Sequence, residues 1–162
     1  MDVKERLLEE EIGNLLRHHG LKIGIAESAT GGMISHRITN VPGCSEYFEG
    51  SVVSYSNQIK MNLLGVKVST IKSFGAVSSE TSKEMASGIR STMIVDVGLA
   101  TTGIAGPHGG TPAKPVGLVY IGLAINGAIV SRRHIFHGNR NENKRSFSDA
   151  ALGILNEYLQ KL

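Results

Sequence analysis

Ser28 lies in the segment AESATGG, residues 26–32, where an apolar run gives way to two glycines. A hydroxyl at the corner between a strand and a helix can lie beside free backbone N–H groups of the first helical turn. Such donors suit a phosphate or the oxyanion of an acyl-transfer reaction. The segment therefore predicts a nucleophile, and the alternative is that Ser28 or Thr30 only caps the helix that follows.

Lys60 supplies a second reactive group, since it follows Tyr55 by five residues and Asn57 by three. On a helix that starts near Ser56, a long side chain can point back over the N-terminal end, toward a cleft there. A serine hydroxyl needs a base to take its proton, and a lysine can be that base only when it is neutral. Burial lowers the pKa of a lysine from its reference value of ~10.4. A solvated surface lysine is the alternative.

A glycine-rich stretch, TTGIAGPHGGTPAKP at residues 101–115, contains four glycines and three prolines. It is neither a Walker loop nor a GxGxxG motif. Gly-rich backbone can cradle a phosphate, and long irregular loops in compact domains are usually functional, although an ordinary connection is the alternative. His108 lies in this loop, whereas the other histidines are scattered and Cys44 is the only cysteine. We therefore expect no metal site and no cofactor.

The elements that must position these groups alternate between strand and helix periods. Strands are predicted over residues 21–26, 50–55 and 93–102, and over 116–125 and 128–136 around an Asn126-Gly127 hairpin turn. Helices are predicted over residues 3–18, 31–39, 56–65, 69–75, 78–92 and 141–162. This order predicts a three-layer α/β/α sandwich with a mixed, partly parallel sheet and a C-terminal β-hairpin followed by a helix. Ligands of such sheets bind beyond the carboxyl ends of the strands, so the three polar segments should share one rim if their strands are parallel neighbours.

Composition limits the class of protein. The chain has 162 residues and a net charge of +3 without a dense Lys/Arg block, so we expect one domain over residues 1–162 and no nucleic-acid partner. The first 16 residues are acidic and amphipathic, unlike a signal peptide, and no apolar stretch reaches the ~18 residues of a membrane span. We expect a cytoplasmic protein with no membrane partner.

Six motifs in order carry a family resemblance: AES-x-TGG, PG-x-S-x-x-F-x-G, VSYSNQIKMNLLGV, GAVSSET, TGIAGPHGGTPAKPVGLVYIGL and F-x-G-x-R. From about residue 5 to the end, the chain resembles the C-terminal domain family of the competence/damage-inducible protein CinA. We expect a standalone member without the molybdopterin-binding-like domain of longer members. The resemblance implies a nicotinamide-nucleotide amidase of NAD metabolism, which hydrolyses the carboxamide of nicotinamide mononucleotide (NMN) to nicotinate mononucleotide and ammonia.

The resemblance also implies residue roles, with a Ser/Lys dyad and no metal. Ser28 and Lys60 match the dyad, and Tyr55 and Ser45 match further polar active-site positions. We expect the loop from Thr102 to hold ribose and phosphate, with Arg37 or Arg140 as counter-charge. The predicted substrate-binding residues are Glu27, Thr30, Gly31, Gly32, Arg37, Asn57, Thr102, Gly103, Ala105, Gly106, His108, Gly109, Gly110 and Arg140.

Two positions depart from the family pattern. Ala29 stands where many members have cysteine, and Asn139 replaces an acid beside Arg140, which could alter how that arginine is held. Two other functions stay open: a nucleotide-binding regulatory module without turnover, and an interaction domain in DNA uptake or repair. The family also suggests a homo-oligomer.

Overall fold

Five strands form one mixed sheet, in the order β2-β1-β3-β4-β5, in the computed structural model, which describes residues 7–162. β1 pairs in parallel with β2 and β3, whereas β4 is antiparallel to both β3 and β5. The strands are β1 (Ile23–Glu27), β2 (Phe48–Val53), β3 (Val97–Gly103), β4 (Leu118–Ile125) and β5 (Ala128–Ile135). The predicted mixed sheet and its C-terminal hairpin are confirmed.

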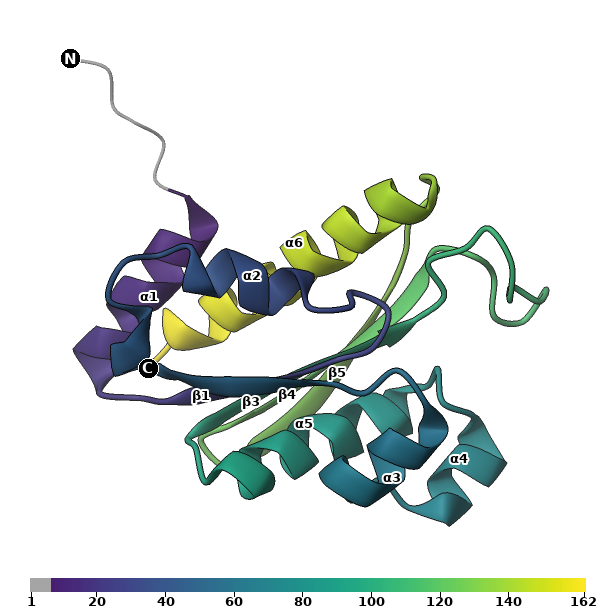
Figure 1. The fold of residues 1–162 in the computed structure, drawn as a ribbon, viewed down its shortest axis with the longest axis horizontal. Helices are drawn as coiled ribbons and strands as arrows, with labels where there is room; N and C mark the ends of the chain where they lie inside the picture. Colours follow the sequence, from purple (N-terminus) through teal and green to yellow (C-terminus); the bar gives the residue numbers. More distant parts are fainter. Residues whose placement is uncertain (1–6) are drawn as a thin grey trace.

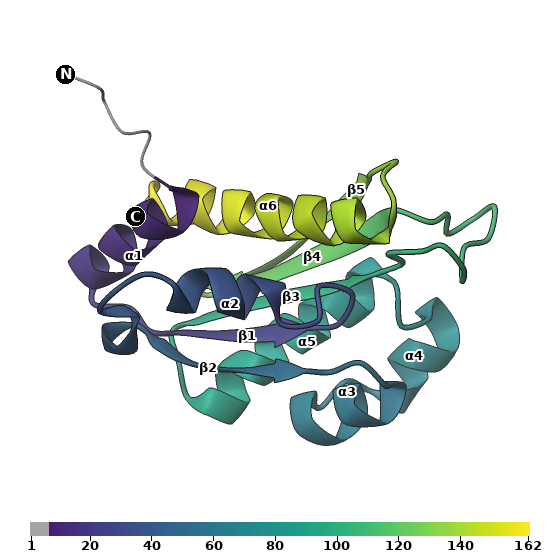
Figure 2. The same ribbon diagram turned by 45° about the horizontal axis from the view of Figure 1, so that its top comes forward.

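Helices cover both faces of this sheet (Figure 1, Figure 2). α1, α2 and α6 pack on one face, and α3, α4 and α5 pack on the other. The helices are α1 (Leu8–His19), α2 (Met33–Thr39), α3 (Asn57–Leu64), α4 (Val68–Phe74), α5 (Ser79–Met93) and α6 (Arg140–Leu159), with a short 3-10 helix at Cys44–Glu46. The predicted three layers are confirmed, and residues 3–6 of the first predicted helix lie outside the described residues.

Side chains along β1 alternate between two separate cores, as the pleat of a strand requires. Ile23 and Ile25 belong to the core beneath α1, α2 and α6, whereas Ala26 belongs to the core beneath α3 and α5. By the same alternation, Glu27 faces the α2 layer and Ser28 faces the α3 layer. Two neighbouring residues with reactive side chains therefore serve opposite faces of the sheet.

Element ends follow local backbone chemistry. Asn126 and Gly127 both have positive φ values, 49° and 80°, as a type I′ hairpin turn requires. The strand predicted over residues 93–102 begins only at Val97. The reason is that α5 continues through Met93 and ends at Ile94, which adopts a left-handed conformation.

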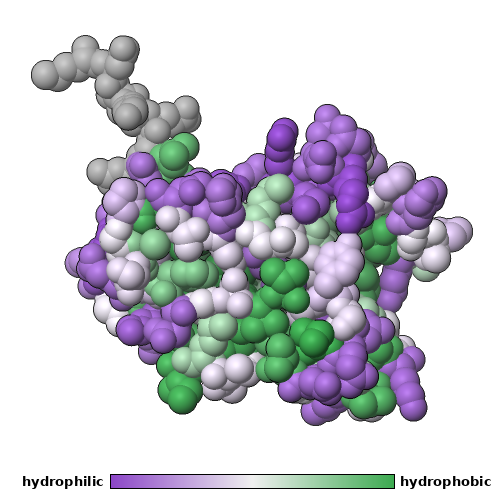
Figure 3. Space-filling model, in the orientation of Figure 1, coloured by the Kyte–Doolittle hydropathy of each residue, from purple (hydrophilic) through white to green (hydrophobic). Residues whose placement is uncertain are grey.

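β2 is an edge strand, and apolar side chains gather where it ends and α3 follows (Figure 3). Val53 and Leu63 are 47% and 48% exposed in this region. The predicted homo-oligomer stays a prediction. Among residues 7–162, no helix is long and apolar enough to cross a membrane.

Candidate functional site

Ser28 is held at the carboxyl end of β1 between its two neighbouring strands. Its backbone N–H donates to the carbonyl of Thr101 at 3.1 Å, beside β3. On the other side, the N–H of Ser54 donates to the carbonyl of Glu27 at 2.7 Å. The Ser28 residue is only 8% exposed. The sheet therefore fixes the backbone that carries this hydroxyl.

Lys60 reaches Ser28 from the first turn of α3. The hydroxyl of Ser56 caps this helix by accepting from the N–H of Ile59 at 3.2 Å. The Lys60 side chain then runs back toward the helix N-terminus, and the residue is only 2% exposed. Its Nζ donates to the carbonyl of Ser54 at 2.7 Å and lies 3.1 Å from Ser28 Oγ. The structure thus brings the two predicted reactive groups into hydrogen-bond contact.

Burial changes the acidity of this lysine. Removal of water from the ammonium lowers the pKa of Lys60 from 10.5 to about 8. No carboxylate in the described part of the chain forms an ion pair with Lys60 to oppose this shift. With a pKa of about 8, roughly a tenth of the molecules carry a neutral amine at pH 7. The amine can therefore accept a proton near neutral pH.

Glu27 is buried behind the site and is used by the fold. Its carboxylate accepts from the backbone N–H groups of Ile34 and Ser35 at 2.8 and 3.3 Å, and from the hydroxyls of Ser35 and Thr30, both at 2.8 Å. The prediction that Glu27 and Thr30 contact substrate therefore disagrees with the structure, because both side chains are fully buried in this network.

The same network changes the expected oxyanion donors. The N–H groups of Ile34 and Ser35, in the first turn of α2, are taken by the carboxylate of Glu27. Before the helix, within residues 7–162, the N–H groups of Ala29 and Thr30 donate to no protein acceptor. Free donors therefore lie next to Ser28, rather than at Ile34 and Ser35.

A cavity of about 220 Å³ opens in front of Ser28 and Lys60. Eight predicted site residues line it: Ser28, Tyr55, Asn57, Lys60, Thr102, Gly103, Ala105 and Arg140. Ala29, which follows Ser28, also lines it, as do Ala76 and Val77, and none of these three is a predicted site residue. Ala76 and Val77 belong to the GAVSSET motif between α4 and α5, and the carbonyl of Ala76 accepts from the Thr102 hydroxyl at 2.7 Å. Small apolar side chains carry no chemical signal, so only that motif could have indicated them.

Arg140 closes one side of this cavity. Its guanidinium donates to the carbonyl of Gly106 at 2.6 Å and to the Tyr55 hydroxyl at 2.8 Å. Asn139 does not hold it. Instead, the Asn139 side chain caps α6 by accepting from the N–H of Glu142 at 3.0 Å, a role that asparagine and aspartate fill equally well. The departure at position 139 therefore leaves the hydrogen bonds of Arg140 intact.

Ser45 does not lie at this cavity. It is exposed in the 3-10 helix that precedes β2, near Tyr47, whose carbonyl accepts from the first residue of β1. Ser28 follows the last residue of that five-residue strand. At ~3.3 Å per residue, the two serines are separated by about 15 Å along the sheet. The structure therefore does not bring Ser45 to Ser28 within one copy of the chain.

Several predicted binding residues are also placed elsewhere. Arg37 forms ion pairs with Glu9 and Asp149, at 2.9 and 2.6 Å, on the α2 face of the sheet, so it is not the counter-charge of the cavity. Residues 108–110 are exposed on the loop after β3 and do not line the cavity. Gly31, Gly32 and Gly106 are not among the residues that line the cavity, and the two glycines that precede α2 have φ values of 60° and 102°.

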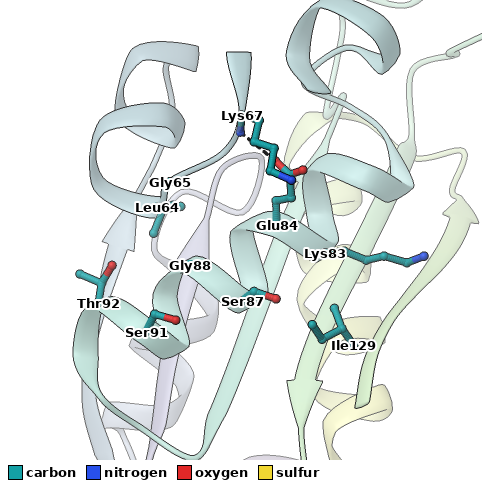
Figure 4. A pocket seen from close by; sticks show the side chains of 10 residues that line it. All are labelled: Leu64, Gly65, Lys67, Lys83, Glu84, Ser87, Gly88, Ser91, Thr92 and Ile129. Atoms are coloured by element: carbon teal, nitrogen blue, oxygen red, sulfur yellow. Dashed lines mark hydrogen bonds between the residues drawn. The ribbon is translucent and has the colours of Figure 1, made fainter. Parts of the chain in front are cut away.

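A wider hollow of about 620 Å³ lies over α5 (Figure 4). The carboxylate that lines this hollow belongs to Glu84, which already accepts hydrogen bonds from the N–H of Lys67 at 2.8 Å and from the Thr70 hydroxyl at 2.7 Å. The lining residues are Leu64, Gly65, Lys67, Lys83, Glu84, Ser87, Gly88, Ser91, Thr92 and Ile129. None of its charged groups has the burial of Lys60, so the smaller cavity at Ser28 is the candidate site.

Within residues 7–162, no cluster of His, Cys, Asp or Glu is suited to hold a metal ion.

The fold and the site define a three-layer α/β domain with a buried serine–lysine pair at the carboxyl end of its parallel strands. The profile of the CinA C-terminal domain matches residues 5–159, and the chain belongs to this family. It is 52% identical over 157 residues to a protein of Halothermothrix orenii named competence-damage inducible protein, and covers 38% of that protein's length. This chain aligns over 96% of its own length in that comparison.

Solved structures agree with this fold. A CinA superfamily protein of Klebsiella pneumoniae matches with a TM-score of 0.92 at 28% identity, over 96% of this chain and 97% of that one. The competence/damage inducible protein CihA of Agrobacterium tumefaciens matches with a TM-score of 0.87 at 34% identity, over the same shares of the two chains. The chain spans between 34% and 39% of the length of the curated relatives it matches.

Proposed function

We propose that this chain hydrolyses the carboxamide of a nicotinamide nucleotide, with NMN as the candidate substrate. The observation that carries the proposal is the contact of 3.1 Å between Lys60 Nζ and Ser28 Oγ, made where burial lowers the pKa of the lysine to about 8. A nucleophile beside a base that is partly neutral at working pH is the arrangement that amide hydrolysis requires. The choice of nicotinamide nucleotides as substrate class comes from the family resemblance.

Ser28 Oγ attacks the carboxamide carbon, and Lys60 accepts the hydroxyl proton. The carbonyl of Ser54 accepts from the amine, so the lone pair of a neutral Lys60 is left to face Ser28. Ala29 lines the cavity, and its backbone N–H is the proposed donor to the oxyanion. Lys60 then gives its proton to the leaving nitrogen, which departs as ammonia. A water molecule, deprotonated by Lys60, releases the carboxylate from Ser28.

The cavity volume decides which part of the substrate enters it. Sites for small ligands usually measure about 300–1,000 Å³, so the cavity of about 220 Å³ suits the pyridine ring better than a whole nucleotide. The ring would lie with its carboxamide at Ser28. Ribose and phosphate would extend outward past Arg140, whose guanidinium supplies positive charge at the cavity wall.

The test is an ammonia-release assay on purified protein with NMN, nicotinamide riboside and nicotinamide side by side. We expect NMN to give the highest kcat/KM and the Ser28→Ala variant to release no ammonia. Binding of NMN without ammonia release would favour the nucleotide-binding regulatory module and contradict the amidase. Equal rates for wild type and Ser28→Ala would remove Ser28 as nucleophile.

A further inference from the structure

Lys144 lies one helical turn after Arg140 on α6, against the turn that follows β1. Its Nζ is 3.5 Å from the position that a Cβ on Gly31 would take. Gly31 belongs to the turn of the nucleophile, because its N–H donates to the carbonyl of Ser28 at 3.0 Å. Figure 2 shows the first turns of α6 beside this β1–α2 connection. The amine of Lys144 therefore lies beside the turn that carries the nucleophile.

Lys144 is half-buried as a residue, and its amine has no counter-charge among residues 7–162. Within residues 7–162, Nζ of Lys144 makes no hydrogen bond and no ion pair. An ammonium that no protein carboxylate neutralises is free to bind an anionic group of a ligand through a charge-assisted hydrogen bond. In the described part of the chain, no side-chain contact of this amine therefore gives it a role in the fold itself.

The carboxylates near these elements are already engaged elsewhere. Glu27 is buried and accepts from the start of α2, and Asp149 pairs with Arg37. Glu142, on the first turn of α6, accepts from the N–H of Asn139 in the capping box. Arg140 at the cavity wall and Lys144 one turn further along α6 therefore present two unneutralised positive charges, which favours a ligand of high negative charge density.

We infer that Lys144, together with Arg140, binds the phosphate of the substrate and makes the site select nucleotides over nucleosides. The inference rests on the proposed function for the position of the pyridine ring in the inner cavity. A ring that fills about 220 Å³ leaves the phosphate end outside, past Arg140 at the cavity wall and within reach of Lys144 one turn further along α6. Lys144 acts on binding, because its amine lies beyond the Ser28–Lys60 pair and is not needed for proton transfer.

The experiment compares Lys144→Gln with Arg145→Gln. Arg145 is the matched control, because it is exposed on the same helix and forms no ion pair in the described part of the chain. Calorimetric titration in a Ser28→Ala background measures Kd for NMN and for nicotinamide riboside without turnover. Loss of one charge-assisted contact should weaken NMN binding about tenfold in Lys144→Gln. The Kd of Lys144→Gln for nicotinamide riboside should change less than about twofold. The Kd values of Arg145→Gln for both ligands should also change less than about twofold.

Ammonia release in the Ser28-containing protein gives a second readout. Lys144→Gln should raise KM for NMN and leave kcat at saturation unchanged. Equal weakening of NMN and riboside, equal effects of the two variants, or no effect of Lys144→Gln would each overturn the inference. If phosphate selectivity depends on Lys144 but no ammonia forms, the inference stands and the amidase proposal fails. If NMN does not bind at all, both fail.

Discussion

Replacing Lys60 by methionine should stabilise the protein while removing its activity. The pKa of Lys60 is lowered from 10.5 to about 8 by burial, so the folded state holds this proton less tightly than the unfolded state. The difference corresponds to about 3 kcal/mol of lost folding stability at any pH below about 8. This penalty fades as the pH rises from about 8 toward 10.5, where the unfolded state also loses the proton. Methionine has a similar length and no charge, so it removes the penalty.

Part of that gain is offset, because the carbonyl of Ser54 loses the donor that now lies at 2.7 Å. An unsatisfied buried carbonyl costs about 1–3 kcal/mol. We therefore expect Lys60→Met to raise the free energy of unfolding at pH 7 by about 1–2 kcal/mol. Urea unfolding measures this, and Lys72→Met, at an exposed position on α4, is the control and should change stability by less than about 0.5 kcal/mol. A loss of stability in Lys60→Met would contradict the burial penalty.

The pH dependence of the wild-type rate tests the same pKa. Between pH 7 and pH 9 the second ionisation of a phosphate ester is complete, so only protein groups should titrate. With a pKa of about 8, the neutral fraction of Lys60 rises about tenfold over this range, and kcat/KM should rise equally and bend near pH 8. A lysine with an unshifted pKa would give about a hundredfold rise without a bend. A hundredfold rise would refute the lowered pKa, and a rate independent of pH would refute the assignment of Lys60 as base.

Four further predictions follow from the same contacts. Lys60→Arg should lower kcat for NMN about as much as Lys60→Met, because a guanidinium cannot lose its proton, and near-wild-type kcat at saturation would demote Lys60 to a binding residue. Ser28→Ala should abolish ammonia release yet change the urea-unfolding free energy by no more than about 1 kcal/mol, so a larger loss would indicate a structural role. Glu27→Gln should lower the free energy of unfolding by about 1–3 kcal/mol, because the NH₂ group of the new side chain would face the N–H groups that start α2. The control Glu49→Gln, at an exposed position, should lower it by less. Dialysis against a chelator should leave ammonia release unchanged, and restoration of a lost rate by a divalent ion would contradict the metal-free dyad.

The layer order and the hairpin could be predicted from sequence because both depend on local patterns. Alternating apolar periods indicated the strands and helices, and Asn126-Gly127 specified the turn that the structure shows with two positive φ values. The start of β3 could not be predicted in the same way. The apolar run from Met93 continues directly into the strand, and only the left-handed cap at Ile94 shows where the helix ends.

The candidate site was predictable where its residues follow parallel strands, and not where distant segments fold over them. Ser28, Lys60 and Thr102 follow from strand ends and from the backward reach of a lysine on a helix. The position of Arg37 depends on which face of a short helix meets α1 and α6, where Glu9 and Asp149 take its charge. Long-range packing of this kind leaves no local signal, and the same is true of Ser45 at the opposite end of the sheet.

The alternation of β1 also sets the electrostatics of Lys60. Glu27 and Ser28 are consecutive, yet the carboxylate points to the α2 layer and the hydroxyl to the α3 layer, in register with Ile25 and Ala26. A shift of one residue would turn the carboxylate toward Lys60. An ion pair there would favour the ammonium and raise its pKa, so that the amine could no longer accept the proton of a serine near neutral pH. The apolar pattern that orients the strand is therefore also what keeps a negative charge away from the base.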